Sequence, residues 1–417
     1  MRYIKVTIVV GFLVSLLVGV LFEVGAFHHL DQGLANFLGL RYSPVSGRFT
    51  QYLLFIGFAF GLAWTTIDIP RFSLKVIIAL GTLAEVICAT CLLNLMGLFF
   101  SPFASALAIL LSFGVGFLYA HSDAGGRKRI LAGVFGDRIS KKTFHTLIDN
   151  DVSLHFGGEV REATVVVCEI FNHLELAENL EVADYVSLIN SFLRNAADYL
   201  VECGGYLDEC DGESLRVVFG TPLPDSHHAA TASEAALGLA GRLDAVNAEC
   251  KRVWNHVFDF RIGINSGEMT VAAYGSRRLG AFSVAGDSVE WARRLCGANL
   301  RYGSRILVGA LTYQLAESRL EVRPIDLVQH HPADRNREEF YELLARKNTL
   351  TDEQRAGRDA FWKGVLFFRQ EQWDLAVEQF ESIAPDHGRS GPVEFYLRRI
   401  EQLRDDAPAL AWNAGDL

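Results

Sequence analysis

Four long apolar windows lie in the first third of the chain, at Ile4 to Phe22, Tyr52 to Ile67, Val76 to Leu98 and Phe103 to Tyr119. A helix needs about 20 mostly apolar residues, with a range of roughly 17 to 25, to cross the hydrocarbon core of a bilayer. Three windows fall within that range, and the second reaches it when its flanks are included. The pattern predicts a transmembrane domain of about four helices over residues 1–122.

The residues beside these windows help to distinguish a membrane anchor from a signal peptide, and they predict the orientation in the membrane. A cleavable signal peptide is the alternative for the first window, but no small-residue cleavage site of the usual kind follows it, so an anchor is favoured. With four spans, one side of the membrane receives Arg2, Lys5, Arg71, Lys75 and the basic run 127–129. Positive charge marks the cytoplasmic side, which predicts a multi-pass inner-membrane protein with both termini in the cytoplasm. Arg41 and Arg48, in the first outside loop, count against this orientation.

Strand and helix patterns alternate in the middle of the chain. Apolar strand patterns occur at Ala163–Ile170, Leu215–Phe219, Phe258–Ile264 and Met269–Tyr274, and helical patterns at Val182–Tyr199, Ala229–Val246 and from Ser288 to Leu295. Such interleaving predicts an α+β domain, which we place at residues 157–347, with helices packed on one face of a sheet.

Two further segments flank this domain. Apolar positions recur at helical spacing from Arg127 to Leu147. Residues 123–156 are therefore expected to form either a helical signalling linker or a plain spacer. The pattern over residues 348–417 predicts a C-terminal segment of helices at Glu353–Arg369, Trp373–Ile383 and Val393–Leu403. The spacing of Trp373, Ala376, Phe380 and Pro385 is similar to one tetratricopeptide-like (TPR-like) unit, which needs a neighbour to cover its apolar face.

Composition excludes some functions. The formal net charge is −10, and no run of Lys and Arg is interleaved with aromatic residues, so we expect no nucleic-acid partner. The seven cysteines fit neither a disulfide framework nor paired zinc ligands. Glu85 lies in mid-span, where an ionisable group is costly and normally faces a bundle interior. We expect it to hydrogen-bond another helix, with a ligand site as the alternative.

Four runs in the α+β region carry a family resemblance: ATVVVCEI at 163–170, DGESLRVVFG at 211–220, RIGINSGEMT at 261–270 and VAGDSVEWARRL at 284–295. In this order and spacing they resemble the class III adenylyl and guanylyl cyclases, from roughly Glu162 to Leu344. The resemblance implies a ferredoxin-like domain. It extends to membrane-bound bacterial cyclases with a CHASE-type sensor, although here the segment from His28 to Arg48 is too short to hold that sensor.

The resemblance also assigns roles to individual residues. Two aspartates in the family hold two magnesium or manganese ions, and the matching positions are Glu169 and Glu213. Glutamate supplies the same oxygen ligands, but its extra methylene group displaces the carboxylate, and Mg²⁺ demands near-ideal octahedral geometry. Metal binding at reduced precision is one interpretation, and two solvated carboxylates at a sheet edge is the other.

The base-reading positions match Glu209 and Ser283. An ionised carboxylate only accepts hydrogen bonds, so Glu209 would repel N1 of adenine and accept two bonds from N1 and N2 of guanine. Guanylyl cyclases have glutamate at this position, which favours GTP over ATP. Chance replacement in a decayed site explains Glu209 equally well.

The ribose and phosphate positions match Glu290, where the family has asparagine, and Arg294. A carboxylate beside a triphosphate is repelled unless Arg293 or Arg294 neutralises it, and pairing with Arg294 would engage the arginine that the phosphate needs. The family's triphosphate-binding lysine has no clear counterpart, with Arg335 or Arg337 as candidates.

Family sites form across a head-to-tail dimer, which implies a homodimer or a heterodimer with another cyclase-like chain. The altered positions predict a pseudoenzyme with reduced or no activity that acts through dimerisation, nucleotide binding or partner assembly. The alternative is an active guanylyl, or less favourably adenylyl, cyclase that converts a nucleoside triphosphate to a cyclic nucleotide and pyrophosphate.

Overall fold

The computed structural model describes residues 2–42, 48–69, 71–95, 97, 99–149, 156–275, 280–329, 337–383 and 391–405. The chain divides into two compact units. The first comprises Met1–Gly133 with Ile148–Asn150, and the second comprises Val134–Leu147 with Asp151–Leu417.

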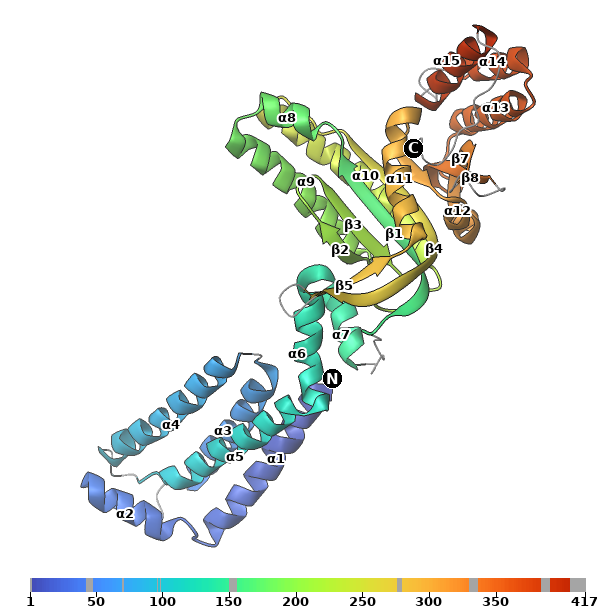
Figure 1. The fold of residues 1–417 in the computed structure, drawn as a ribbon. Coiled ribbons are helices and arrows are strands. Elements are labelled where there is room, and N and C mark those ends of the chain that lie inside the picture. The colour runs from blue at the N-terminus through green and yellow to red at the C-terminus, as the bar shows by residue number, and fades with distance from the viewer. Residues whose placement is uncertain are drawn as a thin grey trace. The chain divides into compact units, whose positions relative to one another are not determined.

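Four long apolar helices dominate the first unit (Figure 1). They are α1 (Arg2–Glu23), α3 (Arg48–Asp68), α4 (Phe72–Leu95) and α5 (Pro102–His121). All four are long and apolar enough to cross a membrane. Helices α1, α3 and α5 share a core, whereas much of α4 presents large exposed apolar side chains. Such a surface is typical of contact with lipid, so the helices suggest membrane association.

The short segment between the first two apolar helices forms α2 (His28–Leu38). Asp31 on this helix is only 4% exposed. Its carboxylate accepts hydrogen bonds from Ser101 Oγ at 2.5 Å and from the Phe103 backbone N–H at 3.4 Å. A carboxylate at the start of a helix offsets the helix dipole and satisfies free N–H groups, so Asp31 fastens α2 to the beginning of α5.

Glu85 lies on the exposed face of α4, which corrects the expectation that it faces the bundle interior. The buried face of α4 comprises Lys75, Ala79, Val86 and Thr90. Glu85 precedes Val86 by one residue, and one residue is a turn of about 100° on a helix, which carries its side chain off this face.

A mixed sheet forms the centre of the second unit. Its strands are β1 (Glu159–Ile170), β2 (Tyr206–Cys210), β3 (Ser214–Phe219), β4 (Phe260–Gly275), β5 (Gly280–Ala285), β6 (Ile306–Val308), β7 (Leu320–Val328) and β8 (Glu338–Arg346). Within the described residues their order is β2-β3-β1-β4-β6-β8-β7, with β5 paired to β4. Strands β4 and β6 are parallel, and the other pairs are antiparallel. Strand β4 is continuous where the pattern predicts two strands.

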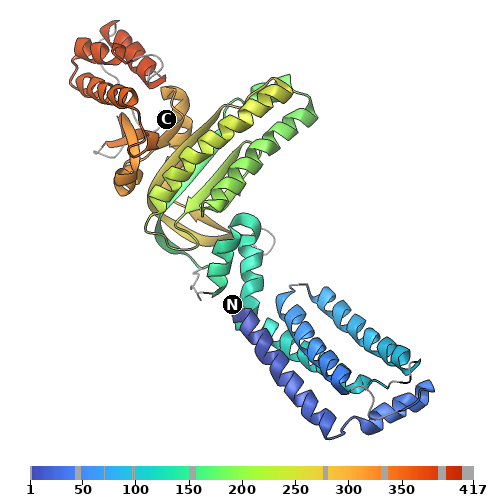
Figure 2. The same ribbon diagram turned by 180° about the vertical axis from the view of Figure 1, so that it is seen from behind.

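Helices cover both faces of the sheet, so the expectation of one covered face is wrong (Figures 1 and 2). Helices α9 (Val182–Glu202) and α10 (His228–Trp254) lie on one face, and α11 (Asp287–Tyr302) lies on the other. Helix α11 approaches closely because Gly263 has no side chain: a Cβ there would lie 2.2 Å from the Ala292 carbonyl oxygen. A glycine inside a strand often marks such a close backbone approach.

The segment before the sheet is helical in two parts, joined by a tight turn. It forms α6 (Asp123–Phe135), a 3₁₀ turn at Gly136–Arg138 and α7 (Lys141–Asp149). Gly136 has φ of 47°, a left-handed conformation that ends helices. Phe135 is fully buried and packs edge-on against Tyr206 and Phe282, with ring centroids 5.8 and 5.0 Å apart. The turn is thereby anchored on β2 and β5.

The C-terminal helices share a core with α11. They are α13 (Asp352–Arg369), α14 (Trp373–Glu381) and α15 (Gly391–Asp405). The shared core includes Trp291, Leu295 and Tyr302 of α11 with Phe361, Val365, Phe380 and Tyr396 of the C-terminal helices. These helices therefore support the helix that carries Glu290 and Arg294. Pro385 lies outside the described residues, and the TPR-like resemblance remains a prediction.

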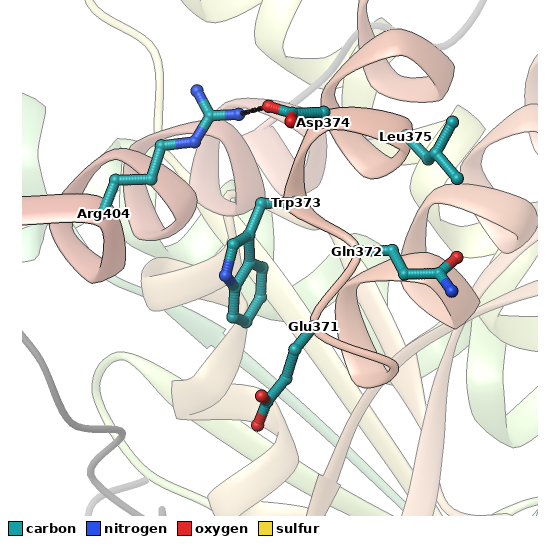
Figure 3. Close-up of a pocket in the computed structure, with 6 residues that line it drawn as sticks. All are labelled: Glu371, Gln372, Trp373, Asp374, Leu375 and Arg404. Carbon is teal, nitrogen blue, oxygen red and sulfur yellow. Dashed lines mark hydrogen bonds and ion pairs between the residues drawn. The ribbon is translucent and has the colours of Figure 1, made fainter.

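Figure 3 shows a shallow pocket of about 330 Å³ at the turn between α13 and α14. It is lined by Glu371, Gln372, Trp373, Asp374, Leu375 and Arg404, and Arg404 pairs with Asp374. The pocket shares no residue with the sequence-predicted site.

We expect Phe380→Ala to destabilise the second unit strongly. Phe380 is fully buried and stacks on Tyr396 at 5.3 Å, and loss of a buried phenylalanine typically costs about 3–5 kcal/mol. Thermal unfolding of the detergent-solubilised chain should show a midpoint lower by about 10 °C. Leu375→Ala on the same helix, where the side chain is 44% exposed, is the control. Equal midpoints for the two variants would contradict a shared core.

Candidate functional site

The structure brings the two metal-ligand candidates together. Glu169 lies near the end of β1 and pairs in register with Ser214 on β3, directly after Glu213. The Ile170 backbone N–H also donates to the Glu213 carbonyl oxygen at 2.9 Å. Partial burial, and next the negative charge of Glu213, raise the pKa of Glu169. Two carboxylates that repel each other in this way form a site that a divalent cation would neutralise.

The two carboxylates fit a magnesium or manganese ion that takes its other ligands from water and substrate. Across the described residues, no group of three or more His, Cys, Asp and Glu side chains is placed to hold a metal. Mg²⁺ is often held by one or two carboxylates together with waters and substrate phosphates. Glu169 and Glu213 would hold such an ion, and the ion would supply charge neutralisation at the phosphates.

Glu290, for which the resemblance predicts the ribose-orienting position, pairs mainly with Arg293. Its two carboxylate oxygens accept hydrogen bonds from Arg293 Nε at 3.0 Å and Nη2 at 2.6 Å. Arg294 Nε lies 3.6 Å from the same carboxylate, at i+4. The hydrogen bond from Arg293 is the largest cause of a lowered pKa at Glu290. Both guanidinium groups therefore already have an anion of the same chain beside them.

Arg293 has a second electrostatic neighbour that the sequence does not reveal. Its positive charge lowers the pKa of Glu169, to a smaller extent than His173 does, against the larger effects of burial and Glu213. This links the carboxylate pair at the end of β1 to the first turns of α11. The signal was present in the motif as two consecutive arginines, but only packing of α11 over β1 shows which of them is close to Glu169.

Glu209, for which the resemblance predicts a base-reading role, forms an ion pair with Arg216 of β3, with Nη1 and Oε2 2.8 Å apart. Arg216 Nε also donates to the buried carboxylate of Asp208 at 2.6 Å. Sequence reasoning missed Asp208 and Arg216. A charged residue within the apolar run Leu215–Phe219 was the available signal.

Ser283 lies on β5, paired in register with Ala272 of β4. The neighbouring Phe282 carbonyl oxygen accepts a hydrogen bond from the Tyr206 hydroxyl of β2. The strands that carry Glu209 and Ser283 are thereby tied together. Of the two candidates for the triphosphate-binding lysine position, Arg337 is exposed just before β8, and Arg335 lies outside the described residues.

We expect Glu169→Gln to stabilise the metal-free chain at neutral pH. The raised pKa means that the folded state prefers the protonated carboxyl, so its contribution to stability is lost as pH rises through the folded-state pKa. The amide removes this penalty and should raise the unfolding midpoint by about 2 °C at pH 7.5 in EDTA. The difference should vanish near pH 4, about the ordinary pKa of glutamate. The control is Glu175→Gln, an exposed position on α8 (His173–Asn179). A lower midpoint for Glu169→Gln at pH 7.5 would contradict the repulsion.

The middle of the chain is similar to known proteins. Residues 158–341 match the family model described as the Adenylate and Guanylate cyclase catalytic domain. Adenylate cyclase 1 of Rhizobium meliloti is 25% identical over 174 residues, which cover 41% of this chain and 26% of that protein. An uncharacterized protein of Mycobacterium tuberculosis is 29% identical over 156 residues, which cover 37% of this chain and 26% of that protein. The match thus spans about a quarter of the length of these relatives.

Two solved structures are also similar to part of this chain. The guanylyl cyclase Cya2 is 23% identical with a TM-score of 0.43, covering 46% of this chain and 96% of that one. The adenylyl cyclase CyaB from P. aeruginosa is 22% identical with a TM-score of 0.42, covering 46% of this chain and 99% of that one. The family model matches the same part of the chain that contains the four motif runs at 163–170, 211–220, 261–270 and 284–295. This chain therefore carries a domain of the class III adenylyl and guanylyl cyclase family at residues 158–341.

Proposed function

We propose that this protein is a membrane-anchored signalling protein that binds a nucleoside triphosphate, preferably GTP, with reduced or absent cyclisation. The single observation that carries the proposal is the pairing of Glu290 with Arg293 and, at longer range, with Arg294. These arginines are the cations of α11 closest to the position that orients ribose and phosphate in the family.

The negative charge of Glu290 opposes efficient turnover. Two unit charges 4 Å apart interact by about 4 kcal/mol at an effective dielectric constant of 20. A triphosphate that approaches α11 meets the repulsion of Glu290 and must compete with it for Arg293 and Arg294. Cyclisation needs these cations most in the transition state, when charge develops on the transferring and leaving phosphates. Binding can survive such competition more readily than catalysis.

Dimerisation is part of the proposal. In the family, metal ligands and phosphate readers of one site come from different chains of a head-to-tail dimer. A homodimer of this protein would carry altered residues at both ends of each site. A heterodimer with an intact cyclase-like chain would restore at most part of one site.

The proposed organisation follows the chain. Residues 1–122 anchor the protein in the inner membrane, 123–156 link the anchor to the cyclase domain, 157–347 form that domain in the cytoplasm, and 348–417 form a TPR-like cap. Support comes from the four apolar helices and from the shared core of α11 with the C-terminal helices.

A second candidate function is an active guanylyl cyclase. The adjacency of Glu169 and Glu213 favours it, because two neighbouring carboxylates are what a pair of magnesium or manganese ions requires. In this reading the ions assist attack of the 3′-hydroxyl on the α-phosphorus. Glu209 and Ser283 read the base, and Arg294 binds the phosphate.

One assay separates the two functions. The purified full chain is incubated with GTP or ATP and manganese, and bound nucleotide and cyclic nucleotide are measured in the same sample. We expect saturable nucleotide binding with little or no cyclic product. Sustained product formation that Glu213→Ala abolishes would overturn the proposal in favour of the active cyclase.

We expect Glu290→Asn to strengthen triphosphate binding by about fivefold, since the removed charge repulsion is of the order of 1 kcal/mol after solvent screening. Asparagine is also the family's residue at this position. The measurement is equilibrium titration with a non-cyclisable GTP analogue, with Glu249→Gln as control. Glu249 is an exposed carboxylate of α10 that pairs with Arg252. Unchanged or weaker binding by Glu290→Asn would show that Glu290 does not obstruct the phosphates.

A further inference from the structure

A β-bulge places two carboxylates opposite one arginine at the base-reading position. The pairing of β2 with β3 shifts register between Leu207 and Glu209, so that Asp208 and Glu209 together oppose Arg216. In a regular strand, consecutive side chains point to opposite faces. The bulge redirects them, and such irregularities occur preferentially beside active sites.

The guanidinium of Arg216 bridges the two carboxylates. Nε donates to Asp208 Oδ2 at 2.6 Å, and Nη1 lies 2.8 Å from Glu209 Oε2. Side-chain exposure rises along this series, from 0% at Asp208 to 24% at Arg216 and 54% at Glu209. Asp208 is therefore the buried anchor, and Glu209 is the end that a ligand can reach.

The backbone of the bulge is fixed from a second direction. Arg138, in the turn before α7, donates from Nη1 to the Asp208 carbonyl oxygen at 3.1 Å. The neighbouring Tyr206 is fully buried and donates its hydroxyl to the Phe282 carbonyl. Asp208 is thus held by its backbone as well as by its carboxylate, and it holds Arg216 in turn.

We propose that Arg216 is a positioning residue that sets purine selectivity by fixing the Glu209 carboxylate. This inference rests on the proposed nucleotide-binding function and deepens it. Arg216 engages Oε2 and leaves further lone pairs of the carboxylate to accept the N1–H and N2–H donors of guanine. N1 of adenine is an acceptor and is repelled by the same carboxylate. A fixed carboxylate favours guanine over adenine more than a freely rotating carboxylate does, because less conformational entropy is lost when guanine binds.

The test measures selectivity and not binding alone. The full chain in lipid nanodiscs is titrated with fluorescent, non-cyclisable GTP and ATP analogues. We expect the wild-type chain to prefer the guanine analogue and Arg216→Gln to reduce the ratio of the two affinities about tenfold, mostly through weaker guanine binding. Arg216→Lys keeps a charge but loses the planar fork, so it should retain part of the preference. Arg305→Gln breaks an ion pair with Asp244 elsewhere in the domain and should leave the ratio unchanged.

Removal of Arg216 alone leaves Asp208 buried without its ion-pair partner, which can unfold the domain. The double variant Asp208→Asn/Arg216→Gln replaces the pair by neutral amides and should fold, as judged by its thermal midpoint, with the same loss of selectivity. A folded double variant with the wild-type ratio would overturn the role of Arg216 and leave nucleotide binding intact. A wild-type chain that prefers the adenine analogue would also overturn the role of Arg216 and leave nucleotide binding intact. Failure of the wild-type chain to bind either analogue would instead overturn the proposed function and this inference with it.

Discussion

Strand β1 constrains the whole cyclase-family domain because it pairs on both sides, with β3 and with β4. Six consecutive residues of the strand, from Ala163 to Cys168, are buried, and the first polar side chain after them is Glu169. Alternation along the strand directs Val166, Cys168 and Ile170 into the core shared with α9 and α10. Glu169 therefore belongs to the face covered by α11. Its position beside Glu213 and within the field of Arg293 follows from this register.

Charge compensation inside one chain is the second theme of the domain. The acidic residues at the altered positions of α11 and β2 each have an arginine of the same chain beside them: Arg293 pairs with Glu290, and Arg216 pairs with Glu209. Arg293 also acts on Glu169. A carboxylate so compensated costs the fold little, but the compensating arginine is then less available to a phosphate. In the proposed function, the pairing of Glu290 with Arg293 thus preserves stability and reduces catalysis.

Several features could be predicted from the sequence because they depend on local patterns. Apolar windows marked the four long helices. The family resemblance named Glu169 and Glu213 together, and the register of β1 with β3 brings them close. The features that were missed depend on tertiary contacts. The bulge at Asp208 leaves no trace in an alternating pattern, and the partner of Arg216 depends on strand register. The position of α11 on the face opposite α9 depends on Gly263, whose role is visible only when the helix is in place. The break after Phe135 was hidden because its apolar positions keep helical spacing across Gly136.

In the proposed function, Glu290 competes with phosphate for Arg293 and Arg294 of α11. A double-mutant cycle on triphosphate affinity tests it most directly, using Glu290→Asn, Arg293→Gln and the combined variant. We expect Arg293→Gln to change triphosphate affinity little while Glu290 is present, because Arg293 is already engaged, and to weaken it about tenfold once Glu290 is replaced. Strictly additive effects of the two substitutions would contradict this competition.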